Sequence, residues 1–93
     1  MGLRFEWDRR KARANLTKHG VSYEASTVFA DGLSLTIPDP DHSEDEERSI
    51  IIGRSNRGQL LVVVHTEIEN TVRIISARKA ERRERVKYEE TKS

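Results

Sequence analysis

Apolar and polar positions alternate in several short stretches of the chain, which is typical of strands that bury one face. We predict strands over residues 3–7, 33–37, 48–54, 59–67 and 71–77. The stretch 59–67 is apolar at both parities, so we expect it at the centre of the sheet. Because short reversals join the later strands, the pattern indicates an antiparallel meander of 4–5 strands.

Helix signals lie on both sides of this group of strands. Asp8 stands at an N-cap position before the segment 9–18, which is rich in good helix formers. A second helix is expected to begin after Ser22 and to end at Asp31 and Gly32, which would complete an N-terminal helical hairpin over one face of the sheet. A C-terminal helix over 79–90 has few apolar residues, so it should not be deeply buried in the monomer.

The order β-α-α-β-β-β-β-α predicts a small α+β fold, and the length of 93 residues predicts a single domain over 1–93. Charged residues make up 35% of the chain against roughly 25% in typical domains, which indicates a highly charged, soluble protein that a partner could complete. Without cysteine, disulfides and cysteine-based zinc sites are excluded. No apolar signal segment and no apolar run long enough to span a membrane are present, so we expect a cytoplasmic protein.

The net charge of +1 hides a strong segregation along the chain. Residues 31–47 carry seven acidic side chains and no Lys or Arg, whereas residues 73–93 carry eight basic and four acidic ones. A basic end is the usual electrostatic footprint of nucleic-acid binding. The plain alternative is a charged helix that is simply solvated.

The acidic segment 39–47 is a possible cation site, because its side chains include Asp39, Asp41, His42 and Asp45. Its spacing fits no EF-hand pattern, and a solvated loop that repels RNA or docks a basic partner is the preferred interpretation. The chain also lacks a P-loop, a dinucleotide fingerprint and a nucleophile elbow. We therefore expect no metal ion and no cofactor.

Arginines near the last predicted strand suit RNA chemistry. Cleavage of RNA without a metal needs a base, an acid and fixed cations around the phosphate, and the planar guanidinium can donate two bonds to it. Arg73 and Arg78 bracket that strand, although their parity differs unless the strand twists or bulges. Arg48 opens a neighbouring strand, and Arg82 lies one helical turn beyond Arg78. Each arginine taken singly could also be a surface charge or a salt-bridge partner.

Two further side chains could transfer protons. His65 lies in an apolar strand, and its ordinary pKa of roughly 6.5 suits proton transfer near neutral pH. A hydrogen-bonded structural histidine is the alternative at that position. Tyr88 on the last helix could donate a proton or stack on a base, or it could pack that helix onto the sheet.

Two blocks of the sequence resemble the BrnT family of type II toxins. The first combines Phe5, Glu6, Trp7, Asp8 and Lys11 with the run 15–21, and the second is the run 73–78. The resemblance spans nearly the whole chain. It implies a RelE-like fold and a ribonuclease activity that stops translation. It also implies a BrnA-like antitoxin with a ribbon-helix-helix part, a complex of two toxins and two antitoxins, and contact with operator DNA through the antitoxin.

With this resemblance, the arginines of the second block become the first choice for phosphate contacts. The candidate catalytic residues are Arg48, His65, Arg73, Arg78 and Tyr88, and the candidate RNA-binding residues are Lys79, Arg82 and Arg83. Trp7, Lys11, Lys18 and His19 are assigned instead to the core or to the antitoxin interface. The alternative function is an inactive toxin homologue that binds nucleic acid or the antitoxin as a co-repressor, and a structural domain with solvated charges is a third possibility.

Overall fold

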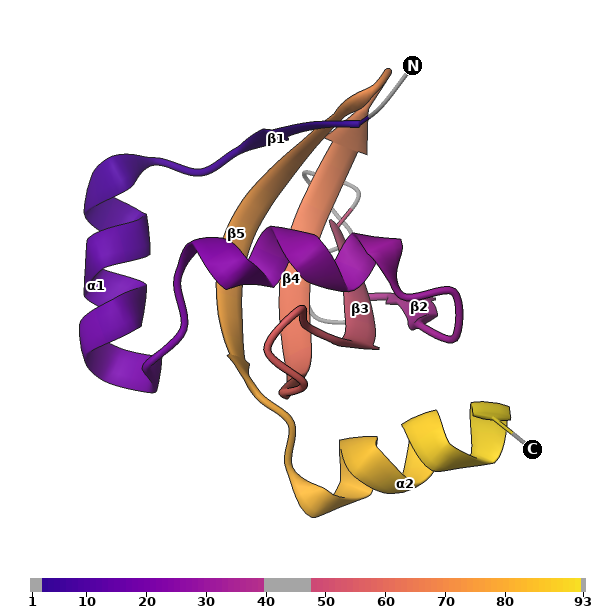
Figure 1. Cartoon of the computed structure of the whole chain (residues 1–93). Coiled ribbons are helices and arrows are strands. Elements are labelled where there is room, and N and C mark those ends of the chain that lie inside the picture. Colours follow the sequence, from indigo (N-terminus) through magenta and orange to yellow (C-terminus); the bar gives the residue numbers. More distant parts are fainter. Residues whose placement is uncertain (1–2, 40–47, 93) are drawn as a thin grey trace.

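The computed structural model describes residues 3–39 and 48–92, which form one five-stranded sheet flanked by helices (Figure 1). The elements are β1 (Arg4–Glu6), α1 (Arg9–His19), the 3-10 helix η1 (Tyr23–Ala30), β2 (Leu35–Pro38), β3 (Arg48–Arg54), β4 (Leu60–Ile68), β5 (Thr71–Lys79) and α2 (Arg82–Lys92). The strands lie in the order β1-β5-β4-β3-β2. The predicted α+β class and the central position of β4 are therefore confirmed.

The direction of the first strand corrects the sequence prediction. Strands β2 to β5 form the expected antiparallel meander, but β1 pairs with β5 in parallel, with Arg4 opposite Thr71 and Glu6 opposite Arg73. The sheet is therefore mixed. Alternation of apolar positions predicts that a strand exists and which face it buries, but it does not predict which neighbour a distant strand will join.

The two N-terminal helices occupy different places. Asp8 caps α1 as expected, because its Oδ1 accepts hydrogen bonds from the backbone N–H groups of Arg10 and Lys11 at 2.9 and 3.1 Å. The second predicted helix is a 3-10 helix, η1, which crosses β5, β4 and β3, whereas α1 stands beside β5 (Figure 1). Of the two N-terminal helices, η1 alone covers the middle of the sheet, whereas the sequence predicted a hairpin of both helices over one face.

Each face of the sheet has its own apolar layer. The first face, which we call the η1 face, packs under η1 and α1 with a buried cluster of Val21, Ala25, Val28, Ile51, Leu61, Val63, Val72, Ile74 and Ala77. The opposite face, which we call the α2 face, has a smaller cluster of Ile52, Leu60, Val62 and Tyr88. Only Tyr88 of α2 belongs to that cluster, and Val86 is 48% exposed, so α2 covers this face only in part.

Asn15 fastens α1 to the outer edge of β5. Its amide nitrogen donates to the backbone oxygens of Val21 and Ala77, both at 2.7 Å, and its Oδ1 accepts from the Ala77 N–H at 3.2 Å. On this side of β5, β1 pairs only with residues 71–73, so it does not reach Ala77. The buried Asn15 side chain takes its place and satisfies both the N–H and the carbonyl of Ala77. This clasp fixes α1 beside the last strand.

Candidate functional site

A bulge in β5 brings two of the predicted arginines to the same face. Val64 pairs with Ser76 and His65 pairs with Ile74, so Ile75 is an extra residue on β5. Arg73 pairs with Thr66 and Arg78 pairs with Val62, a member of the apolar cluster on the α2 face. Positions 62 and 66 share one parity, and both arginines therefore project from the α2 face. Arg73 and Arg78 differ in parity along the chain, so a twist or bulge was needed to bring them to one face, and the extra residue Ile75 provides it.

Four paired positions form a row across the α2 face, which we call the cross-strand row. Arg48 on β3 and Arg73 on β5 both pair with Thr66 on β4, and Glu6 on β1 pairs with Arg73. Neighbouring strands lie about 4.8 Å apart, which places the Cα atoms of Arg48 and Arg73 about 10 Å from each other. Arg73 and Glu6 are exposed, Arg48 is half-buried, and Thr66 is only 7% exposed.

One end of this row borders a hollow in the surface, which we call the edge groove. Its lining residues come from β1, from the connection to α1, from the first turn of α1 and from β5, and Figure 1 shows how these segments are arranged. It is lined by Phe5, Glu6, Trp7, Asp8, Lys11, Arg73, Ile74 and Ile75. The exposed Arg73 guanidinium has no hydrogen bond or ion pair with any residue in the part of the chain that the structure describes. It is therefore available to an anionic ligand.

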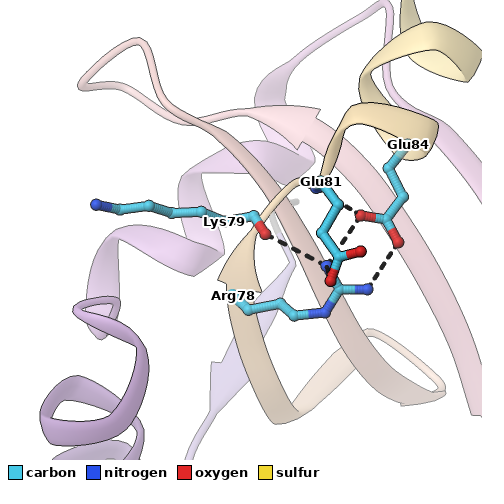
Figure 2. Close-up of polar contacts among 4 residues, drawn as sticks. All are labelled: Arg78, Lys79, Glu81 and Glu84. Atoms are coloured by element: carbon cyan, nitrogen blue, oxygen red, sulfur yellow. Dashed lines mark hydrogen bonds and ion pairs between the residues drawn. The ribbon is translucent and has the colours of Figure 1, made fainter.

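Arg78 lies on the same face but is already paired. Its Nη1 and Nη2 donate to the two carboxylate oxygens of Glu84 at 2.9 and 2.7 Å, and Nη1 also donates to the Lys79 carbonyl at 3.3 Å (Figure 2). These hydrogen bonds with Glu84 raise the pKa of Arg78 and lower the pKa of Glu84. Binding of a phosphate by Arg78 would have to compete with this pair.

The same Glu84 carboxylate caps the last helix. Its Oε1 accepts a hydrogen bond of 2.7 Å from the backbone N–H of Glu81, which immediately precedes α2 (Figure 2). This reach from the third helical position back to the cap is half of a capping box. Arg78 and Glu84 together therefore fix the junction between β5 and α2, which identifies Arg78 first as a structural residue.

His65 lies on the other side of the sheet. Its ring is 3% exposed and packs edge-to-face on Phe29, with 4.9 Å between ring centroids. Burial lowers its pKa, against a smaller opposing effect of the nearby Glu67 carboxylate. Its Nδ1 has no hydrogen-bond partner among residues 3–39 and 48–92. The structure therefore separates His65 from the arginines of the cross-strand row.

Tyr88 is likewise buried away from the row. It is 2% exposed, and its hydroxyl donates to Asp31 Oδ2 at 2.7 Å while Arg54 stacks over its ring at 5.6 Å. Burial, followed by the bond to Asp31, raises the pKa of Tyr88. This geometry matches the packing alternative from the sequence, since Tyr88 anchors α2 to the sheet.

The three predicted RNA-binding residues do not form one patch. Lys79 pairs with Leu61 of the η1 face, and its side chain points away from Arg78 (Figure 2). Arg82 and Arg83 are exposed in the first turn of α2. Of the three, Arg82 and Arg83 belong to α2, which begins after the end of β5 that carries Arg78.

The candidate cation site from the sequence falls largely outside the described residues, which include Asp39 but not Asp41, His42 or Asp45. Within the described ranges, no group of three or more His, Cys, Asp or Glu side chains is arranged to hold a metal ion. No helix in those ranges is long and apolar enough to cross a membrane.

Sequence reasoning missed two residues that organise this region. Asn15 was visible only as part of the resembling block, and its clasp on Ala77 depends on how α1 docks. Glu6 enters the row only because β1 pairs in parallel with β5. Glu6 also belongs to the resembling block, and the alternation of Leu3, Phe5 and Trp7 indicated that it faces away from them, but neither signal placed it beside Arg73.

The five-stranded mixed sheet with its helices defines a small α+β protein, and Arg48, Arg73 and Arg78 project from one face of that sheet. The chain belongs to the BrnT family, because the family model for the ribonuclease toxin, BrnT, of type II toxin–antitoxin systems matches residues 7–84. The family assignment from the sequence is therefore confirmed, and with it the class of ribonuclease toxins that have an antitoxin partner. No curated protein matches the chain.

One solved structure supports the fold. It is the 1.1 Å crystal structure of the Brucella abortus ribonuclease toxin, BrnT, which superposes with a TM-score of 0.67 at 24% sequence identity. The match covers 86% of this chain and 99% of that chain. At this identity the likeness concerns the fold alone, and the more specific RelE-like description stays a prediction.

Proposed function

We propose that this chain is a metal-independent endoribonuclease that uses the α2 face, with Arg73 as the residue that binds the scissile phosphate. The observation that carries the proposal is the position of Arg73. It is exposed, it has no partner in the described ranges, and it shares the cross-strand row with Arg48 and the edge groove with Lys11. A phosphate placed there would meet the Arg73 guanidinium and the Lys11 ammonium, in a groove that Glu6 and Asp8 also line.

The chemistry needs little beyond these charges. The 2′-oxygen of the RNA attacks the adjacent phosphorus, the 5′-oxygen leaves, and negative charge grows on the non-bridging phosphate oxygens. Arg73 can donate two hydrogen bonds to those oxygens, and Arg48, about 10 Å away at Cα, can reach the same or the next phosphate. The products are a 2′,3′-cyclic phosphate and a 5′-hydroxyl.

The other candidate residues take supporting parts in this proposal. Arg78 is a positioning residue that holds α2 beside the face, and Arg82 and Arg83 guide the RNA backbone from the start of α2. Lys79 contributes only long-range positive charge. His65 and Tyr88 act in packing, because each is buried away from the row.

For the partner, we propose a BrnA-like antitoxin with a ribbon-helix-helix part, in a complex of two toxins and two antitoxins that reaches operator DNA through the antitoxin. The toxin would act in the cytoplasm and stop translation. The sequence resemblance supports this assignment. Exposed apolar side chains such as Leu16 and Tyr23, which are 51% and 62% exposed, offer area that a partner can cover.

A second candidate function is a co-repressor that binds nucleic acid or the antitoxin without cutting RNA. The observation in its favour is that both proton-transfer candidates from the sequence, His65 and Tyr88, are buried elsewhere. The same exposed Arg73 would then bind a phosphate that is not cleaved.

The test is an assay of the purified chain, freed of antitoxin, on RNA in the presence of EDTA. We expect fragments that end in a 2′,3′-cyclic phosphate, and we expect added antitoxin to stop their formation. Cleavage that EDTA abolishes would contradict metal independence. Intact RNA, together with normal growth of cells that express the chain alone, would favour the co-repressor.

A further inference from the structure

The parallel pairing of β1 with β5 places a carboxylate beside Arg73. Glu6 is directly opposite Arg73 in the register. The preceding residue, Phe5, packs against Phe29 in a tilted arrangement with 5.3 Å between ring centroids, and this contact places Phe5 on the η1 face. Because side chains alternate along a strand, Glu6 projects from the opposite face, on the side of Arg73 and Thr66.

Both side chains also border the same hollow. Glu6 and Arg73 line the edge groove together with Lys11 from the first turn of α1. Glu6 is the last residue of β1, and beyond it the chain turns away from β5 toward α1 (Figure 1). The carboxylate therefore stands at an open position, where an RNA strand bound to Arg73 can approach it.

Glu6 also differs from Asp8, Glu84 and Asp31 because its carboxylate has no partner among the residues that the structure describes. Asp8 caps α1, Glu84 is paired with Arg78, and Asp31 accepts from Tyr88 and from the Arg54 backbone at 2.9 Å. Glu6 is exposed and has no hydrogen bond or ion pair with any residue that the structure describes. It is therefore free to accept a proton.

We infer that Glu6 is the general base of the RNA cleavage, an inference that rests on the proposed ribonuclease function. Its carboxylate removes the proton of the 2′-hydroxyl as the 2′-oxygen forms a bond to phosphorus held by Arg73. The bond from phosphorus to the 5′-oxygen breaks with its electron pair, and that oxygen takes a proton from water. The hydroxide formed is neutralised by the proton that Glu6 then releases, so that the enzyme returns to its starting state.

The experiment compares Glu6→Gln, which keeps shape and removes the base, with Glu6→Asp and with Glu90→Gln, an exposed acid on α2. Single-turnover cleavage is measured on a defined RNA, and affinity is measured on the same RNA carrying a 2′-O-methyl group at the cleavage position. Positioned bases contribute about 10²- to 10⁴-fold, so we expect Glu6→Gln to cleave at least a hundredfold more slowly. Affinity should stay within about threefold, since the base does not hold the phosphate.

The controls separate this inference from the proposed function. Glu6→Asp should keep part of the activity, and Glu90→Gln should match the natural chain. If Glu6→Gln cleaves as fast as the natural chain while Arg73→Gln does not cleave, the inference is overturned and the phosphate site stands. If the natural chain itself leaves RNA intact, the proposed function fails, and the inference fails with it. Thermal melts of all variants verify that the exposed Glu6 position tolerates the changes.

Discussion

Arg78 and Glu84 are joined by two parallel hydrogen bonds of 2.9 and 2.7 Å, which connect the end of β5 to the first turn of α2. Bidentate pairs of this kind are stronger and more directional than a single ion contact. Together with the buried Tyr88, the pair holds a helix with few apolar residues on the sheet. The pair also gives Arg78 a structural role, since loss of its side chain would disturb the junction between β5 and α2 even without a ligand.

We expect Arg78→Ala to lower the free energy of unfolding by about 1 kcal/mol, because a partly exposed bidentate pair is lost. Arg78→Lys should lower it less, since an ammonium keeps the charge but cannot donate two parallel bonds. Urea unfolding of the natural chain, Arg78→Ala, Glu84→Gln and the variant that carries both substitutions gives a double-mutant cycle. Strict additivity of the Arg78→Ala and Glu84→Gln effects would show that the pair adds nothing.

The same pair should be sensitive to acid. Its hydrogen bonds lower the pKa of Glu84 below the ordinary value of 4.5, so the folded state binds the Glu84 proton more weakly than the unfolded state. The stabilisation is therefore complete above pH 4.5 and is lost as the pH falls through the lowered folded value. The coupling energy should accordingly shrink on acidification.

His65→Phe should leave RNA cleavage within about twofold of the natural chain, since the ring lies on the η1 face and packs on Phe29. The substitution should also change the pH dependence of stability. Burial lowers the folded pKa below 6.5, so stability is complete above that pH and falls as the pH drops toward the folded pKa. Unfolding curves between pH 5 and 8 should show this slope in the natural chain and its loss in the variant. A hundredfold loss of cleavage would instead return His65 to the catalytic set.

Tyr88→Phe should cost about 1 kcal/mol of stability and little activity. The hydroxyl is buried and donates to Asp31, so its loss removes one hydrogen bond while the ring still fills the pocket among Ile52 and Val62. Chemical unfolding and cleavage are measured side by side. Full stability combined with abolished cleavage would contradict the packing role and support direct chemistry by the phenol.

Asn15→Leu should destabilise the chain by about 3 kcal/mol, because it leaves the backbone groups of Ala77 and the Val21 carbonyl without the partners they have now. The matched control is Asn70→Ala in the exposed turn between β4 and β5, which should be nearly neutral. Equal effects of the two substitutions would mean that the clasp on β5 is unimportant.

Much of the fold was predictable because its meander follows local signals. The cap at Asp8 and the turn before β4 appear in the structure where the sequence placed them, and β2 exists but begins at Leu35 instead of residue 33 and includes Pro38. The parallel pairing of β1 with β5 was not predictable, because the apolar pattern of a three-residue strand does not indicate which distant strand it pairs with. The 3-10 form of η1 was likewise missed, since apolar spacing over eight residues does not distinguish it from an α-helix.

The candidate site was predictable as a set of residue types and much less as an arrangement. Arg73 and Arg78 have opposite parities along the predicted strand, and only the bulge at Ile75 places them on one face. The sequence could not assign a face to His65, because β4 is apolar on both sides and either face was open to a histidine. Glu6 required the three-dimensional register.

Arg73 is the residue proposed to bind the scissile phosphate, and one comparison of variants tests this role most directly. RNA cleavage in EDTA is measured for the natural chain, for Arg73→Gln, and for Arg57→Gln in the exposed turn before β4, which removes the same charge far from the cross-strand row. We expect Arg73→Gln to cleave at least a hundredfold more slowly, with an unchanged melting temperature, and Arg57→Gln to cleave normally. Equal cleavage by the two variants would contradict the assignment of the phosphate site to this face.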